Sequence, residues 1–183
     1  KKIKKIKAIP INLEIAANNE MLRIALRNKP NFVCIVPENR KEITTEGGLN
    51  IKKNNKKVSM IVNKLNQNKI RTSLFINPNL KDVKLAKKIG SKCIEIHTGK
   101  ISNKIKNKQS YVKDLENIKK CAKLGKLLGL EVHAGHGMDY KTAKILSRVK
   151  EIEEFNIGHF IIGESIFDGF KHTIKKFKRI IQS

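Results

Sequence analysis

The stretch Cys93-Ile94-Glu95-Ile96-His97 decides the fold class, because apolar and polar side chains alternate along it. Successive side chains of a β-strand point to opposite faces, so Glu95 and His97 share one face and the two isoleucines share the other. The same alternation occurs at Ile11-Asn12-Leu13-Glu14. Both stretches therefore predict strands with one apolar face and one face that carries groups able to do chemistry.

Similar apolar runs, rich in β-branched residues, recur along the chain, and each is followed by a polar stretch with helical periodicity. The expected strands are residues 9–15, 32–36, 72–76, 93–97, 130–134 and 155–157. The expected helices are residues 19–28, 54–68, 80–89, 110–128, 140–149 and 168–182. Strands that alternate with helices form parallel sheets joined by right-handed crossovers. The fold class is therefore predicted to be α/β.

Ionisable and amide side chains fall toward the carboxyl ends of several of these strands. A doubly wound sheet would concentrate such groups at one switch point, whereas a (β/α)8 TIM barrel assembles its active site from many strand ends. The barrel is therefore favoured. It needs eight strand–helix units, typically in about 250 residues, and this chain offers six in 183 residues. We expect residues 1–183 to form a single TIM-barrel domain that lacks its first two units; the alternative is an intact six-unit open sheet.

The formal net charge is +24, from 40 Lys+Arg against 16 Asp+Glu. Such a charge suggests nucleic acid as a partner, but only six of the basic residues are arginines, the side chain that reads base edges best. Aromatic residues for base stacking make up only 5% of the chain. We interpret the lysines as solvated surface and do not expect a nucleic-acid partner. A basic nucleic-acid- or anion-binding α/β module without catalysis is the alternative function.

Cys34, Cys93 and Cys121 are odd in number and widely spaced, which favours buried free thiols in a reducing cytoplasm over disulfides. No apolar run approaches the roughly 20 residues of a membrane span. The sequence has no Walker loop and no GxGxxG motif, and its histidines lack the spacing of metal ligands. We therefore expect a cytoplasmic protein without a membrane partner, a cofactor or a metal.

The candidate acid–base groups are Glu14, Glu95, His133, His136 and His159. A carboxylate that faces a barrel interior is costly to bury without a partner, so a polar site is favoured over simple packing. Each carboxylate taken alone could equally be structural, and a single histidine is more often a core or surface residue than a site residue. Their position together at one rim is what points to a site. Gly137 and Gly158 stand beside two of the histidines, where a close backbone can donate N–H groups to a phosphate; the alternative is a plain turn glycine.

Six motifs, in order over essentially the whole chain, together resemble the pyridoxine 5′-phosphate synthase family. They are Asn12-Leu13-Glu14, Val36-Pro37-Glu38 with Thr44-Thr45-Glu46-Gly47-Gly48, Ser73-Leu74-Phe75-Ile76, Ile94-Glu95-Ile96-His97-Thr98-Gly99, Ala134-Gly135-His136-Gly137 and Asn156-Ile157-Gly158-His159. The resemblance implies a (β/α)8 barrel assembled into an octamer. It also implies a cofactor-independent condensation of 3-amino-2-oxopropyl phosphate with 1-deoxy-D-xylulose 5-phosphate, which gives pyridoxine 5′-phosphate and inorganic phosphate.

By the same resemblance, Glu14 is the general base, His136 the proton donor and Glu95 the carboxylate that stabilises charge during ring closure. Thr44 and Gly137 match substrate-binding positions. Gly158 and His159 match the site for 3-amino-2-oxopropyl phosphate. The family's Asn-x-Asp-His strand, and a following strand with a catalytic His and phosphate-binding Arg residues, have no counterpart in this sequence. We therefore expect these 183 residues alone to be inactive.

Overall fold

The computed structural model describes residues 9–37 and 47–182 of the chain. Its strands are β1 (Asn12–Ala16), β2 (Phe32–Val36), β3 (Arg71–Ile76), β4 (Cys93–His97), β5 (Glu131–Gly135) and β6 (Glu154–Asn156). Its helices are α1 (Asn19–Asn28), α2 (Asn55–Gln67), α3 (Leu80–Ile89), α4 (Gly99–Lys106), α5 (Val112–Leu127), α6 (Tyr140–Leu146), α7 (His159–Asp168) and α8 (Phe170–Gln182). Strands and helices alternate, which confirms the predicted α/β class.

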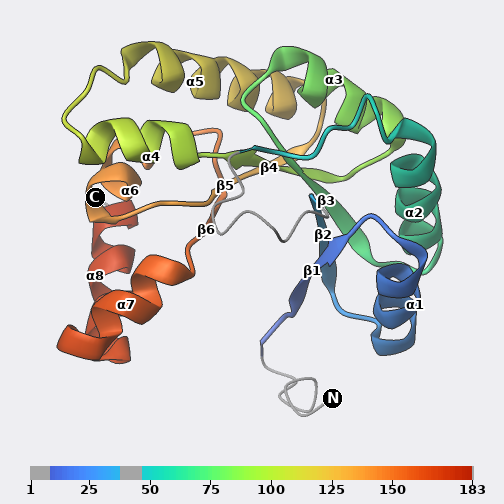
Figure 1. Ribbon diagram of the computed structural model, residues 1–183, viewed down its shortest axis with the longest axis horizontal. Helices are drawn as coiled ribbons and strands as arrows, with labels where there is room; N and C mark the ends of the chain where they lie inside the picture. Colours follow the sequence, from blue (N-terminus) through green and yellow to red (C-terminus); the bar gives the residue numbers. More distant parts are fainter. Residues whose placement is uncertain (1–8, 38–46, 183) are drawn as a thin grey trace.

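The six strands form one parallel sheet in chain order, β1-β2-β3-β4-β5-β6. The sheet curls, and helices α1, α2, α3 and α5 wrap its outer side (Figure 1). Because parallel strands all end at the same edge, the turns that follow them meet at one rim of this half-barrel. The predicted alternation of strands and outer helices is therefore present over the described residues.

The two faces of the sheet differ in polarity, as the period of two in the sequence predicted. On the outer face Ile35, Leu74 and Ile94 are fully buried, and they belong to one apolar core with Ile61 and Leu65 of α2. Burial of each such side chain contributes about 1.5–3 kcal/mol to folding. The inner face carries most of the polar side chains of the strands, so the core lies between the sheet and its helices rather than inside the curl.

Local residues define the ends of several helices. The side chain of Asn18 accepts a hydrogen bond from the backbone N–H of Met21 at the start of α1, and Asn79 and Asp139 act in the same way at α3 and α6. Gly90 ends α3 in the left-handed conformation that glycine adopts without strain.

Several sequence predictions of secondary structure were wrong. The first strand begins at Asn12 rather than at residue 9, because Pro10 has no N–H to donate and Ile9 is exposed. Helix α4 was not predicted. Helix α7 was not predicted either, because apolar residues spread around it leave no 3.6-residue period. Gly169, with φ +76°, separates α7 from α8, so the predicted helix 168–182 begins at Phe170.

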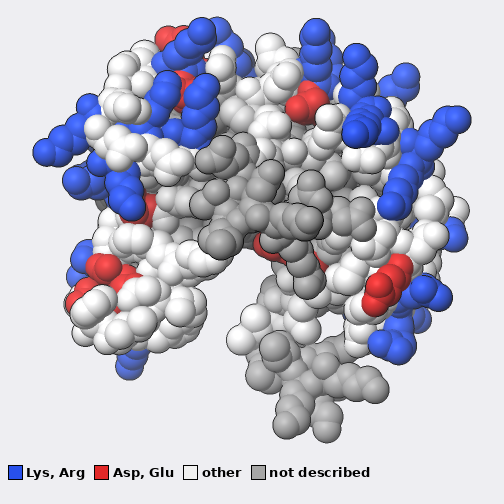
Figure 2. Space-filling model, viewed as in Figure 1, with Lys and Arg blue, Asp and Glu red and all other residues white. Residues whose placement is uncertain are grey.

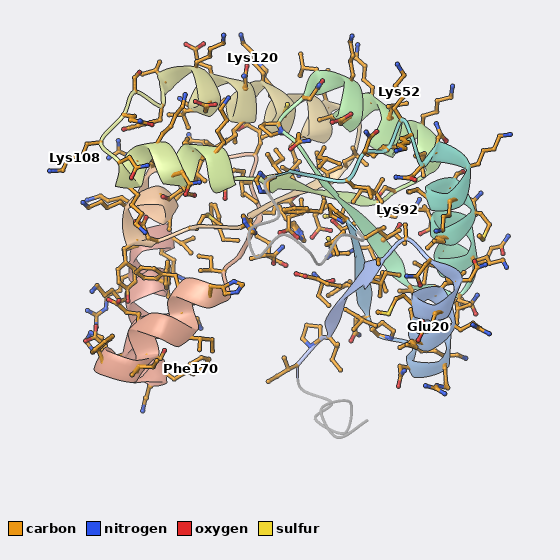
Figure 3. The ribbon with its side chains drawn as sticks, in the orientation of Figure 1. Glu20, Lys52, Lys92, Lys108, Lys120 and Phe170 are labelled. Carbon is orange, nitrogen blue, oxygen red and sulfur yellow. The ribbon has the colours of Figure 1, made fainter. Side chains whose placement is uncertain are left out.

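The basic side chains are spread over the outer helices (Figure 2). Lys52, Lys108 and Lys120 are exposed and extend away from the fold (Figure 3). This distribution agrees with the interpretation of the lysines as solvated surface. All three cysteines are buried free thiols, as predicted. Of the described helices, none combines the length and the apolar composition that a membrane crossing requires.

Candidate active site

A cavity of about 1030 Å³ lies at the carboxyl edge of the sheet. Strands β1, β4 and β6, the turn after β5 and helix α7 all contribute to its lining. Six of the seven site residues predicted from the sequence line it: Glu14, Glu95, His136, Gly137, Gly158 and His159. The seventh, Thr44, lies outside the described residues. The structure therefore brings together the predicted residues that it describes.

Glu95 projects from the inner face of β4 and is 5% exposed. It fits there because its neighbour Gly135 has no side chain: a Cβ at Gly135 would overlap the Glu95 carboxylate. The thiol of Cys34 on β2 donates a hydrogen bond to Glu95 Oε2, with 3.5 Å between the sulfur and the oxygen. The carboxylate is thus enclosed between strands.

Burial raises the pKa of Glu95 to about 7, and the negative charge of Glu14 acts in the same direction. The neighbouring side chains of Asn156 and Cys34 oppose the shift. A carboxyl group with this pKa exchanges its proton near neutral pH. It is therefore suited to acid–base chemistry or to stabilising a positive charge that develops during a reaction.

His136 follows β5 with a backbone φ of +79°, in the left-handed region. Its ring stacks on that of His97, with 4.8 Å between the centroids and 26° between the planes. The ring of Phe75 meets both imidazoles edge-on. Burial lowers the pKa of His136, nearby His159 lowers it further, and Glu14 opposes the shift. Glu14 therefore acts electrostatically on both Glu95 and His136.

Gly158 and His159 stand at the opening of α7, a ten-residue helix whose first turn borders the cavity. No side chain caps this end of the helix. The first N–H groups of a helix have no partner within it, and the helix dipole favours negative charge there. The place is suited to an anion such as a phosphate group.

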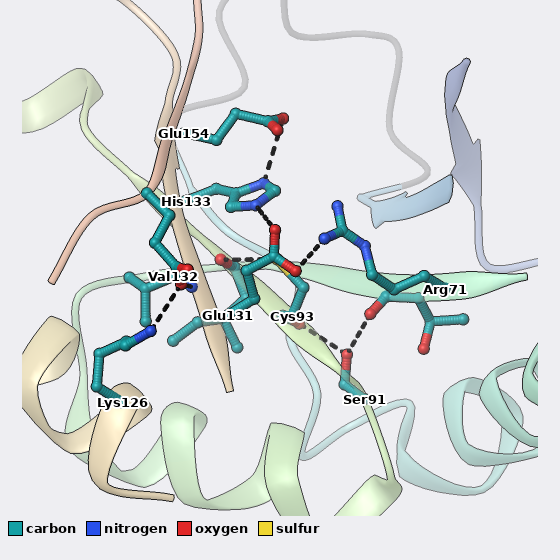
Figure 4. Close-up of polar contacts among 11 residues, drawn as sticks. Arg71, Ser91, Cys93, Lys126, Glu131, Val132, His133 and Glu154 are labelled. Atoms are coloured by element: carbon teal, nitrogen blue, oxygen red, sulfur yellow. Dashed lines mark hydrogen bonds and ion pairs between the residues drawn. The ribbon is translucent and has the colours of Figure 1, made fainter. Parts of the chain in front are cut away.

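His133, a candidate acid–base group in the sequence, does not line the cavity. It is fully buried deeper inside the curl, where Nε2 lies 3.0 Å from Glu131 Oε1 and Nδ1 lies 3.4 Å from Glu154 Oε1. Arg71 pairs with the same Glu131 (Figure 4). His133 is therefore part of a polar cluster with Glu131 and Glu154 on the inner face and does not belong to the cavity lining. Among the described residues, no group of three His, Cys, Asp or Glu is arranged to hold a metal ion.

Sequence reasoning missed the contacts that Cys34, Phe75 and His97 make with the site. Cys34 was predicted only as a buried thiol, yet the register places it opposite Glu14 on the inner face. Phe75 lies opposite Glu95 in the register of β3 and β4, so its ring also faces the inner side.

The family model described as "Pyridoxal phosphate biosynthesis protein PdxJ" matches residues 1–183. The chain is 62% identical over 179 residues to a pyridoxine 5′-phosphate synthase of Pelagibacter ubique, a match that covers 98% of this chain and 75% of that protein. It is 43% identical over 175 residues to the protein of the same name from Zymomonas mobilis, covering 96% of this chain and 68% of the other.

Among solved structures, the tryptophan synthase A-subunit from Pyrococcus furiosus, a TIM barrel, has a similar fold, with a TM-score of 0.61. The match covers 100% of this chain and 70% of that one at 14% identity, so it bears on the fold alone. It confirms the predicted TIM-barrel class. Together with the cavity at the strand ends, the family match and the identities to two synthases show that the chain belongs to the pyridoxal phosphate biosynthesis protein PdxJ family.

Proposed function

We propose that the cavity at the carboxyl edge joins 3-amino-2-oxopropyl phosphate to 1-deoxy-D-xylulose 5-phosphate and closes the pyridine ring of pyridoxine 5′-phosphate, with release of inorganic phosphate. Family membership supports the reaction. The observation that carries the assignment to this cavity is the convergence of Glu14, Glu95 and His136 on one space, with the charge of Glu14 acting on both other groups.

Each of these groups has a role that fits its surroundings. Joining an amine to a ketone and losing water requires repeated proton removal and donation, which positioned carboxylate and imidazole groups supply. Exposed Glu14 is the general base. His136, presented by its turn, is the proton donor. Enclosed Glu95 stabilises positive charge that develops during ring closure, because its carboxylate ionises close to neutral pH.

Both substrates carry a phosphate, so the site needs places for anions. The N–H groups at the opening of α7, with Gly158 and His159, bind the phosphate of 3-amino-2-oxopropyl phosphate in this proposal. Gly137, beside the acid–base groups, contacts a substrate, and Thr44 keeps the substrate-binding role that its match to the family implies. His159, on the cavity rim, adds a side chain that can donate to phosphate oxygens.

The assembly and location of the protein are also proposals. Within the described residues β1 pairs only with β2 and β6 only with β5, and such edges are a liability that a closed barrel removes. We propose that two further strand–helix units close the barrel, that the 183 residues alone are inactive, and that the closed protein is a homo-octamer. Three buried free thiols support a cytoplasmic location.

The experiment measures turnover of the two substrates by the complete gene product and by three single variants. Glu14→Gln and His136→Asn remove an acid–base group with little change in size, so kcat is expected to fall by about 10²- to 10⁴-fold with unchanged circular dichroism. Lys120→Glu, on the outer surface, serves as the control and is expected to keep full turnover. Silent Glu14→Gln and His136→Asn variants, with DNA binding weakened by Lys120→Glu, would favour the binding-module alternative.

A further inference from the structure

The turn that carries His136 has an unusual backbone. His136 and Gly137 both have positive φ, at +79° and +72°. Gly137 adopts this conformation freely, whereas a residue with a Cβ rarely does and needs its surroundings to hold it there. Contacts outside the turn must therefore keep His136 in place.

Thr98 supplies those contacts. It follows β4, whose last residue His97 pairs with Gly135 in the sheet. The Thr98 backbone N–H donates to the Gly135 carbonyl at 2.8 Å, and Thr98 Oγ1 lies 2.8 Å from the same oxygen and 2.6 Å from the His136 carbonyl oxygen. The hydroxyl of this fully buried residue therefore lies within hydrogen-bond distance of two carbonyl oxygens, one directly before His136 and one of His136 itself.

The residue after Thr98 fits closely against the rings it helps to align. A Cβ at Gly99 would lie 2.8 Å from His97 Cε1 and 3.0 Å from His136 Cδ2. A Cβ at Gly137 would lie 3.3 Å from Gly99 Cα. The Thr98–Gly99 turn thus touches both the backbone of His136 and the edge of its ring, which leaves the imidazole little freedom to turn away from the cavity.

We propose that Thr98 is a positioning residue for the reaction: its hydroxyl locks the left-handed backbone of His136 and so aims the imidazole at the substrate. This inference rests on the proposed function, in which His136 donates a proton. Thr98 does not line the cavity. Its effect should therefore fall on the proton-transfer step rather than on substrate binding, since misalignment of a catalytic group slows chemistry without removing a substrate contact.

The test compares two substitutions in the complete gene product. Thr98→Val keeps the size of the side chain and removes the hydroxyl, whereas Thr98→Ser keeps the hydroxyl. Thr98→Val is expected to lower kcat tenfold or more with KM within twofold, and to move the His136 ring Cε1 resonance in the NMR spectrum of the substrate-free protein. Thr98→Ser should stay within threefold of the parent in kcat and keep that resonance in place.

Thr173→Val is the matched control. Thr173 lies in α8 and is equally buried, and its hydroxyl donates a hydrogen bond to the Gly169 carbonyl at 3.2 Å. It should leave kcat and the His136 resonance unchanged. If Thr98→Val does not fold, Gly99→Ala replaces it: the added methyl displaces the His136 ring and is expected to lower kcat with the hydroxyl intact.

An unchanged kcat and an unchanged His136 resonance in Thr98→Val would overturn the proposal. So would equal losses in Thr98→Val and Thr98→Ser, which would mean a packing role. Failure of the proposed function would give a different result. His136→Asn would then remain fully active, while Thr98→Val would still shift the His136 resonance from its position in the parent protein.

Discussion

The carboxylate of Glu95 lies against Gly135 of the neighbouring strand so closely that a Cβ there would overlap Glu95 Oε1. The same Cβ would come within 3.1 Å of Asn156 Cβ on the next strand. The missing side chain of one residue thus provides the space for the acidic group of another. The position of Glu95 in the cavity depends on this pairing.

Replacing Gly135 with alanine should therefore displace Glu95 or push β5 and β6 apart. We expect Gly135→Ala to destabilise the fold by about 1–3 kcal/mol, as overpacking of a tight interior does, and to lower kcat. Chemical denaturation measures the first effect. Gly163→Ala is the control, because nothing lies within 4 Å of a Cβ at Gly163 in α7; its stability should stay equal or rise. Equal stability of the two variants would contradict the account.

The raised pKa of Glu95 predicts how stability depends on pH. Above its unfolded value of 4.5, the carboxyl ionises in the unfolded chain but keeps its proton in the fold up to about pH 7. The fold is therefore destabilised as pH rises between these values. At about 1.4 kcal/mol per pKa unit, the full penalty is roughly 3 kcal/mol.

Glu95→Gln removes this penalty because an amide does not ionise. We expect the variant and the parent to be equally stable at pH 4, and the variant to be more stable at pH 8, as measured by urea denaturation at each pH. A difference that is constant over this range would show that ionisation of Glu95 is not its cause.

The three thiols are expected to be unreactive in the folded protein. Burial raises the pKa of Cys93 to about 12 and that of Cys121 to about 11, and burial together with the charges of Glu95 and Glu14 raises the pKa of Cys34. Because the thiolate is the nucleophile, iodoacetamide at pH 8 should add nothing to the native protein by mass spectrometry and should label all three cysteines in urea. Gln109→Cys, at an exposed position, is the labelling control; rapid modification of Cys34 would contradict the enclosed site.

The backbone of His136 predicts a reversed preference between glycine and alanine. Both His136→Gly and His136→Ala remove the ring, but only alanine carries the steric cost of about 1 kcal/mol in the left-handed region. His136→Gly should therefore be the more stable by about that amount in thermal or urea unfolding. At exposed His172 within α8 the order should be the ordinary one, with alanine more stable by up to about 1 kcal/mol. The same order at both positions would mean that the turn is unstrained.

The sequence predicted the strands and the rim of the site because its signals are local. Alternation along β4 places Glu95 on the inner face, and helix starts such as Asn18 and Asn79 carry their own capping side chains. Four of the six strands were predicted with an end that is wrong by one or more residues. These errors do not change which side chains face inward, because the alternation along each strand already assigns them to a face.

What the sequence could not predict depends on neighbours that are distant along the chain. His133 hydrogen-bonds to Glu131 and lies near Glu154 instead of lining the cavity, and this placement depends on its depth in the curl. Helix α7 has apolar side chains but no periodic pattern. The contact of Cys34 with Glu95, 61 residues away, required the register of three strands.

The most direct measurement is the stoichiometry of products formed by the complete gene product from 3-amino-2-oxopropyl phosphate and 1-deoxy-D-xylulose 5-phosphate, with His136→Asn measured in parallel. We expect one pyridoxine 5′-phosphate and one inorganic phosphate per pair of substrates consumed, and at least a hundredfold slower formation of both by His136→Asn. No pyridoxine 5′-phosphate from the folded parent protein, or an equal rate from His136→Asn, would contradict this expectation.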